Sequence, residues 1–204
     1  MLASSSTLIK VWRPLVSESK RNEIMRRLYK YFARNGFEDL HHLSRLSKVD
    51  FISRTLFYFY FKNTEDLFDH LCAYHKTKVD VAYRFVVNNK LDFLEYIYHL
   101  VEFKDIYFFT IRCQAKVEDD ERFNTCLSYS LETLDAYSYE QFLIHFKLDG
   151  LSKSEIKFMY ESFRSFWFAN SHPFDDWSEE SVTLLLERVT NLIELLKRET
   201  LEKE

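Results

Sequence analysis

Apolar residues recur at helical spacing along almost the whole chain. Between residues 20 and 35, Ile24, Leu28 and Phe32 follow one another at four-residue steps and therefore line one face of a helix. Gly36 comes directly after the last turn, where a residue with a left-handed backbone commonly closes a helix. The pattern predicts a first helix over 20–35.

Three more helices are predicted before residue 90. The second is expected to begin near Asp39, whose carboxylate can cap it. A third is expected over 52–60, after a turn at 48–50. The fourth is expected to begin at residue 63 or 64, because acidic residues in the next turn suit the positive end of a helix dipole.

The remainder of the chain is also helical in pattern. Ser152 and Glu155 form the signature of a capping box, which marks the start of a helix. Only two glycines and two prolines occur among 204 residues, and a sheet protein needs many tight turns built from these residues. We therefore expect an all-α fold, in which the later helices cover 91–103, 105–115, 119–147, 153–170 and 179–199.

Composition limits the location of the protein. No apolar run approaches the roughly 20 residues of a membrane span, so no membrane association is expected. The first residues lack the charged start and apolar block of a secretion signal. The three cysteines, Cys72, Cys113 and Cys126, lack metal-ligand spacing and are interpreted as buried, reduced thiols. These features predict a cytoplasmic protein.

Charge is distributed unevenly. Residues 1–64 contain twelve Lys and Arg against five Asp and Glu, a formal charge of +7, whereas the remaining residues total −11 because the whole chain carries −4. A basic end on an acidic body suits a protein whose one end meets a polyanion. An ordinary solvated distribution of charge is the alternative.

The basic part resembles the DNA-binding head of the tetracycline-repressor (TetR) family. The resemblance covers roughly residues 20–70 and rests on the apolar first helix, the Gly36-Phe37 pair and the run SRTLFYFYFKNTEDL over 53–67. Aligning the resemblance on Gly36-Phe37 places Asp50 in the turn where that family usually has glycine, whereas aligning it on Phe61-Lys62-Asn63 places Phe51 there; Asp50 is preferred because aspartate tolerates a left-handed backbone. The resemblance implies an N-terminal arm over 1–19, a helix-turn-helix domain over 20–62, and a connector helix with an effector-binding and dimerisation body over 63–204.

A helix-turn-helix places the start of its second helix in the major groove. Base contacts are therefore expected from Ser53, Arg54, Thr55 and Tyr58, and Arg54 is the best candidate because a guanidinium can pair with guanine through two hydrogen bonds. Most rings of the run 57–61 are expected to pack between the first and fourth helices. Phosphate contacts are expected from Lys20, Arg21, His42, Arg45, Lys48, Lys62 and Asn63.

The body is crowded with aromatic residues between 91 and 170. The TetR resemblance implies a pocket there for a small apolar effector, although the sequence indicates no individual ligand-binding residue. The wide apolar arcs of 153–170 and 179–199 predict a homodimer through these two helices.

The sequence thus predicts a transcriptional regulator that binds double-stranded DNA, a repressor released by a small molecule. The alternative is a TetR-like dimeric module for ligand or protein binding that has lost specific DNA binding. No phosphate loop, nucleophile elbow or dinucleotide fingerprint is present, and the histidines show no metal-ligand spacing, so no enzyme activity, cofactor or metal is expected.

Overall fold

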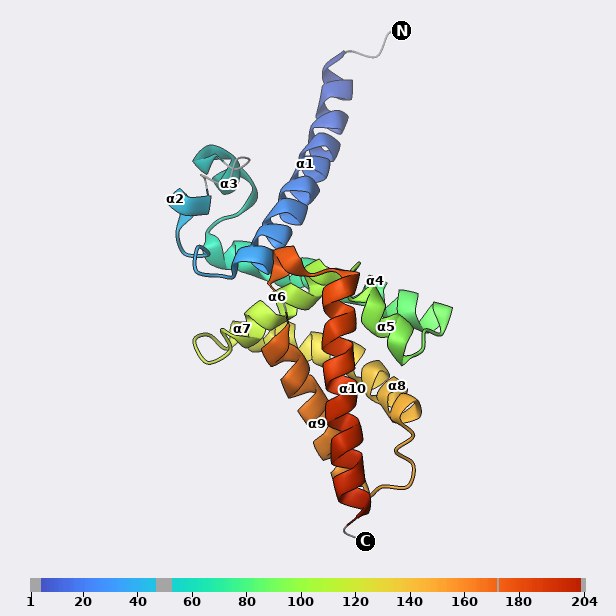
Figure 1. Cartoon of the computed structure of the whole chain (residues 1–204). Helices are drawn as coiled ribbons and strands as arrows, with labels where there is room; N and C mark the ends of the chain where they lie inside the picture. Colours follow the sequence, from blue (N-terminus) through green and yellow to red (C-terminus); the bar gives the residue numbers. More distant parts are fainter. Residues whose placement is uncertain (1–4, 47–52, 172, 203–204) are drawn as a thin grey trace.

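The computed structural model describes residues 5–46, 53–171 and 173–202, except the side chains of 5–17, 43 and 44. Every regular element among the described residues is helical, which confirms the all-α prediction (Figure 1). The elements are α1 (Ser5–Asn35), α2 (Leu43–Leu46), α3 (Arg54–Tyr60), α4 (Thr64–Asn89), α5 (Phe93–His99), α6 (Lys104–Gln114), α7 (Arg122–Ser130), the π-helical turn η1 (Leu131–Asp135), α8 (Ala136–Phe146), α9 (Lys153–Asn170), the 3₁₀ turn η2 (Phe174–Asp176) and α10 (Glu179–Leu201).

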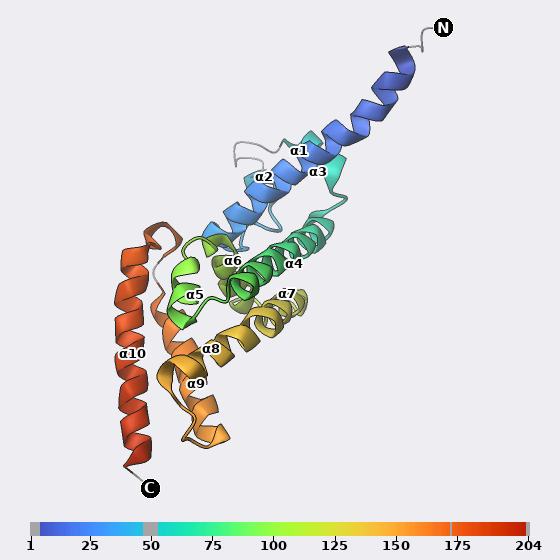
Figure 2. The same cartoon turned by 90° about the vertical axis from the view of Figure 1, so that its right-hand side faces the viewer.

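The helices form an elongated molecule. In Figures 1 and 2, α1 projects from a body built of α4 to α10, and α2 and α3 lie beside α1. The N-terminus of α1 and the C-terminus of α10 lie at opposite ends. The helices α9 and α10 lie alongside each other and run in opposite directions, and α10 leads to the C-terminus. The small elements that carry the predicted DNA contacts are thus separated from the long helices at the other end.

The first helix is longer than the sequence pattern predicts. It begins at Ser5 instead of near Lys20, so most of the expected arm over 1–19 is helical. It ends at the predicted place, because Gly36 adopts a positive φ of 81°, which glycine tolerates without steric cost. The amide of Gly36 donates to the carbonyl of Phe32 and completes the last turn.

The second predicted helix is only a single turn, Leu43–Leu46. Asp39 does not cap it. The Asp39 carboxylate instead accepts hydrogen bonds from the Tyr31 hydroxyl at 2.6 Å and from the Arg45 guanidinium at 3.1 Å. The hydrogen bond from Tyr31, followed by that from Arg45, holds the pKa of Asp39 below its usual range. The prediction of a helix from Asp39 was therefore wrong, because stronger partners take its carboxylate.

Later helices follow the predicted limits closely. The fourth helix begins at Thr64 with Asn63 as its cap, and Ser152 and Glu155 form the predicted capping box at the start of α9. The helix predicted over 119–147 is present as α7, η1 and α8, which follow one another without a break. At α4 and α9 the predicted capping residues thus gave the correct boundaries.

One hydrophobic core joins α1 to the body. Phe109 on α6 is its centre: the ring is fully buried, stacks on Tyr29 of α1 with 4.5 Å between centroids, and meets Phe37 edge-on at 5.2 Å. Phe37 also contacts Phe123 of α7 at 4.8 Å. The C-terminal half of α1 is therefore packed on the body through Tyr29.

The cysteines depart from the prediction. Cys72 on α4 and Cys126 on α7 are joined in a disulfide, with their Cα atoms 5.7 Å apart, so the expectation of reduced thiols was wrong for this pair. The packing of α4 on α7 brings together two residues that are 54 positions apart in the sequence. Cys113 is free and buried, as expected. Disulfides are typical of oxidising compartments, so the thiols no longer support a cytoplasmic location.

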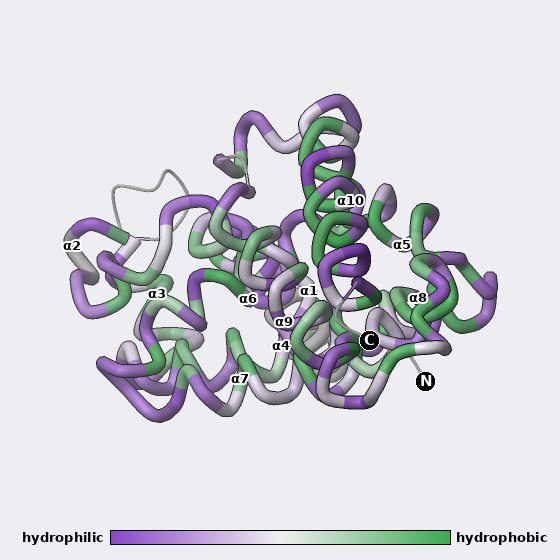
Figure 3. Tube along the Cα trace, turned by 60° about the horizontal axis from the view of Figure 1, so that its bottom comes forward, coloured by the Kyte–Doolittle hydropathy of each residue, from purple (hydrophilic) through white to green (hydrophobic). Residues whose placement is uncertain are grey.

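The last helix buries most of its apolar arc within its own chain. Hydrophobic and hydrophilic turns alternate along α10 in Figure 3. Leu185 is only 2% exposed, and Val182, Val189 and Ile193 are also buried. These side chains are therefore not available to a partner subunit. Leu184 and Leu195 remain exposed, at 43% and 48%, so a dimer through α10 has less apolar surface than the sequence suggests.

Candidate nucleic-acid interface and body cavity

The N-terminal end of α3 is exposed at the predicted base-reading positions. Ser53 caps the helix, because its hydroxyl accepts a hydrogen bond from the Leu56 amide at 3.2 Å. Arg54 and Thr55 are exposed in the first turn, and Tyr58 is 57% exposed one turn later. Ser53 thus has a structural role in starting α3, while the other three side chains are free to meet a ligand in solution.

The aromatic run of α3 is split between core and surface. Phe57 and Phe61 are buried and Tyr60 is half-buried, so the predicted core packing holds fully for only two of the five rings. Phe59 is 69% exposed and was missed by the sequence analysis. Helical periodicity could have identified it, since residues two positions apart on a helix point in different directions. Phe59 and Tyr58 give α3 an exposed aromatic pair.

The turn into α4 orders two more predicted contacts. The Asn63 side chain accepts from the Asp66 amide at 2.8 Å, and the Lys62 amide donates to the Asp66 carboxylate at 2.8 Å. The Lys62 ammonium is exposed. Asn63 therefore caps α4, and Lys62 is the stronger candidate for a phosphate contact at this turn.

The remaining residues predicted to contact phosphate differ in whether another side chain of the protein already binds them. Lys20 and His42 are exposed. Arg21 is partly committed, because its guanidinium donates to Nε2 of His70 on α4 at 2.6 Å. Arg45 pairs with Asp39, although its side chain stays 61% exposed. Lys48, and Asp50 in the predicted turn, lie outside the described residues.

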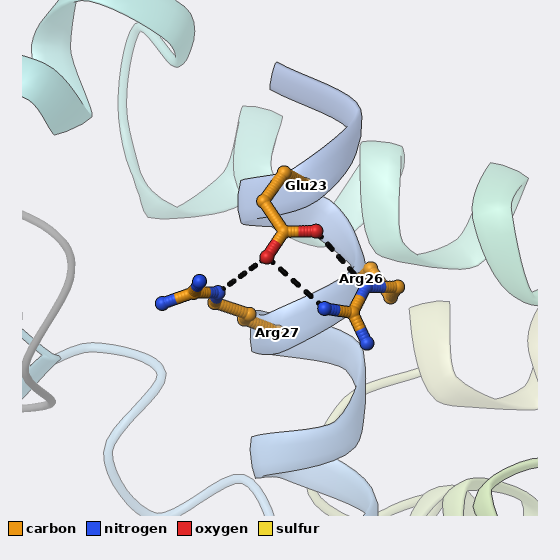
Figure 4. A network of polar contacts seen from close by, with 3 residues as sticks. All are labelled: Glu23, Arg26 and Arg27. Carbon is orange, nitrogen blue, oxygen red and sulfur yellow. Dashed lines mark hydrogen bonds and ion pairs between the residues drawn. The ribbon is translucent and has the colours of Figure 1, made fainter. Parts of the chain in front are cut away.

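A second basic cluster lies on the exposed face of α1 (Figure 4). Arg26 approaches both carboxylate oxygens of Glu23 at 3.0 Å, and Arg27 approaches one of them at 2.6 Å. The hydrogen bonds from Arg26 and then Arg27 lower the pKa of Glu23 to about 2. Glu23 thus remains ionised and offsets one of the two arginine charges at neutral pH. A phosphate approaching this face competes with Glu23 for both guanidinium groups.

The structure brings some of these residues together. Figures 1 and 2 place α2, the helix of Arg45, next to α3, the helix of Arg54, beside α1. Lys62 follows α3 directly in the chain. The exposed side chains of α2, α3 and the following turn form the candidate interface.

The body contains a cavity of about 100 Å³ between α4, α5, α6, η1 and α9. Asp135 lines this cavity. Its carboxylate accepts a hydrogen bond from the Tyr160 hydroxyl at 2.6 Å and pairs with Arg164 at 3.3 Å. These two charges balance, so the wall favours a neutral molecule. The lining is mainly apolar and comprises Ala82, Val86, Tyr96, Ile97, Leu100, Phe103, Ile106, Tyr107, Thr110, Ser130, Leu131, Leu134, Asp135, Ser138, Tyr160, Phe163, Arg164, Trp167 and Phe168.

Comparison with known proteins adds no identification. No protein-family model matches this chain, and no curated protein or solved structure matches it either. Across the described residues, no helix is long and apolar enough to cross a membrane. Any functional conclusion therefore rests on the candidate interface at α2, α3 and the following turn, and on the body cavity.

Proposed function

We propose that this protein is a transcriptional regulator that binds duplex DNA through α3 and is released by a small apolar molecule bound in the body cavity. The main support is the exposed N-terminal end of α3, where Arg54 and Thr55 project from a capped helix. The TetR resemblance of residues 20–70 and the charge of +7 over residues 1–64 are consistent with the same role.

In this proposal Arg54 reads a base and Lys62 positions the protein on phosphate. Replacing Arg54 by alanine is expected to cost about 1–3 kcal/mol at the preferred site and to relax the preference at one base pair. Replacing Lys62 by alanine should weaken binding to all sequences alike and reduce the salt slope by about 1. Fluorescence anisotropy with a selected duplex and a scrambled duplex separates these effects.

Arg84→Ala is the matched control, because Arg84 is exposed on α4 in the body and lies outside the helices of the proposed dimer. It should leave DNA affinity unchanged. An Arg54→Ala variant that keeps both affinity and sequence preference would show that α3 does not read DNA in this register.

The proposal includes a homodimer that uses the outer faces of α9 and α10. Such a dimer can present two copies of α3 to half-sites about 34–36 Å apart, one turn of DNA. The double variant Leu184→Glu, Leu195→Glu should be a folded monomer, because both side chains are exposed in one subunit. Leu185→Glu should instead unfold the chain, since it places a charge in the core. Light scattering and circular dichroism distinguish these outcomes, and a monomeric unmodified protein would rule out the dimer.

A second function is supported by the surface of α3. Tyr58 and Phe59 are large exposed aromatic groups, and such residues are enriched where proteins bind proteins. Arg21 and Arg45 are each partly engaged within the chain. The alternative is accordingly a dimeric ligand-binding or protein-interaction module that has lost specific DNA binding. Binding-site selection from random duplexes distinguishes the two, since this module enriches no sequence.

A further inference from the structure

A buried chain of hydrogen bonds runs from α1 to the cavity. The Tyr29 hydroxyl lies 2.7 Å from Nδ1 of His75, and Nε2 of His75 lies 2.6 Å from the Ser130 hydroxyl. His75 is fully buried on α4, and Tyr29 and Ser130 are nearly so. The chain therefore links three helices, α1, α4 and α7, without contact with solvent.

The donor and the acceptor of each hydrogen bond in this chain follow from the protons that each group carries. Burial lowers the pKa of His75 to about 3, so the ring is neutral and carries one N–H. The Ser130 hydroxyl donates its only proton to the Cys126 carbonyl at 3.1 Å. Ser130 must then accept from Nε2–H of His75, which leaves Nδ1 to accept the proton of Tyr29. The Tyr29 hydroxyl thus depends on His75 for its acceptor, and the His75 ring depends on Tyr29 and Ser130 for its hydrogen bonds.

The hydrogen-bond chain ends at the cavity on one side and at α1 on the other, and these are the two places that a ligand-controlled regulator must connect. Ser130 and its neighbour Thr110, whose hydroxyls are 3.4 Å apart, both line the cavity. At the other end, Tyr29 stacks on Phe109 and belongs to α1, the helix that projects beside α2 and α3. His75 completes the cluster by stacking on Phe109, 4.7 Å between centroids.

The backbone changes from the α-helix α7 to a π-helical turn where the hydrogen-bond chain meets the cavity. Directly after Ser130, residues 131–135 form the π-helical turn η1, and Leu131, Leu134 and Asp135 all line the cavity. Single π turns are frequent at functional sites and can convert to α-helix with a shift of register. A ring such as benzene occupies an engineered cavity of about 150 Å³, so a one-ring ligand fits a cavity of about 100 Å³ only if its wall moves.

Building on the proposed function, we propose that the Ser130–His75–Tyr29 chain senses occupancy of the cavity and transmits it to α1. A neutral one-ring molecule displaces η1 and Ser130, the hydrogen bond between Ser130 and His75 lengthens, and Tyr29 loses its fixed acceptor. The lower half of α1 then loosens while the rest of the body is stabilised by the bound ligand.

Phenol is a suitable probe because it combines one ring with a hydroxyl group. Amide hydrogen exchange is measured with and without phenol in α1, over residues 24–33, and in α10, over residues 182–193, as an internal reference. In the unmodified protein, phenol should raise the exchange of α1 relative to α10 by about fivefold or more, within the usual range of coupling between sites.

Tyr29→Phe removes only the hydroxyl that ends the chain. This variant should bind phenol as well as the unmodified protein does, as followed by a rise in Tm, but should lose the difference between α1 and α10. Tyr31→Phe is the matched control on the same helix, because the Tyr31 hydroxyl bonds to Asp39 and not to the chain. Ser130→Ala, which breaks the chain at the wall of the cavity, should also lose the difference between α1 and α10 when phenol is bound.

Three results would overturn the inference: no binding of phenol to the unmodified protein, equal slowing of exchange in α1 and α10, or an unchanged response in Tyr29→Phe. None of these measurements involves DNA. A protein that gives the expected exchange pattern but binds no duplex would keep the chain as a sensor and refute the regulatory function. The reverse combination would refute the chain alone.

Discussion

Phe109→Ala is expected to lower the free energy of unfolding by about 3–5 kcal/mol, the usual cost of emptying a buried aromatic site. Phe109 is completely buried and stacks on both Tyr29 and His75. It also meets Phe37 edge-on. Truncation removes contacts from α1 and from α4 at once, and the rigid rings around it cannot collapse into the space. Single domains are only marginally stable, so this loss is a large share of the total.

Urea denaturation followed by circular dichroism measures this effect. Phe59→Ala is the matched control, because the Phe59 ring is 69% exposed on α3, outside the helices of the proposed dimer, and it should change stability by about 0.5 kcal/mol or less. Similar losses for the two variants would show that α1 does not depend on α6 for its position.

Acid should destabilise the protein through His75. The pKa of His75 is lowered to about 3 by burial, whereas a histidine in the unfolded chain titrates near its ordinary value of 6.5. Above pH 6.5 the ring is neutral in both states and contributes no pH dependence. As the pH falls from 6.5 towards 3, the unfolded state binds a proton that the folded state excludes. Stability then falls by about 1.4 kcal/mol per pH unit from this group alone.

Comparison with His75→Gln isolates that contribution. Other groups with lowered pKa values, including Glu23 and Asp39, also cost stability in acid, but they are present in both proteins. Between pH 6 and pH 4, the variant should therefore lose stability with a slope about 1.4 kcal/mol per pH unit smaller than the unmodified chain. His42→Asn, at an exposed position, is the control. Identical slopes for His75→Gln and the unmodified protein would contradict a buried, neutral His75.

Local sequence signals predicted much of the fold. Gly36, Asn63 and Ser152 mark helix ends or starts that depend only on nearby residues, and each occurs where the sequence places it. The one-turn α2 was not predicted, because Asp39 is bound by Tyr31 and Arg45 and does not cap a helix. The pairing of Cys72 with Cys126 also depends on tertiary packing.

The sequence predicted which residues of the candidate site are exposed. It did not predict which of them are engaged by other side chains of the same protein. Exposure of Arg54, Tyr58 and Lys62 follows from helical spacing on α3 and the turn after it. The engagement of Arg21 by His70 depends on the contact between α1 and α4, which no local pattern specifies. The same holds for the buried chain at His75, since its members come from three helices far apart in the sequence.

The most direct test of the central proposal is the salt dependence of duplex binding by the unmodified protein. Fluorescence anisotropy is recorded with a duplex obtained by selection from random sequences, at several salt concentrations. If the head binds DNA, the logarithm of the affinity should fall linearly with the logarithm of the salt concentration, by about 0.9 for each phosphate contact. Failure to bind any duplex at low salt, or an affinity independent of salt, would contradict the proposed regulator.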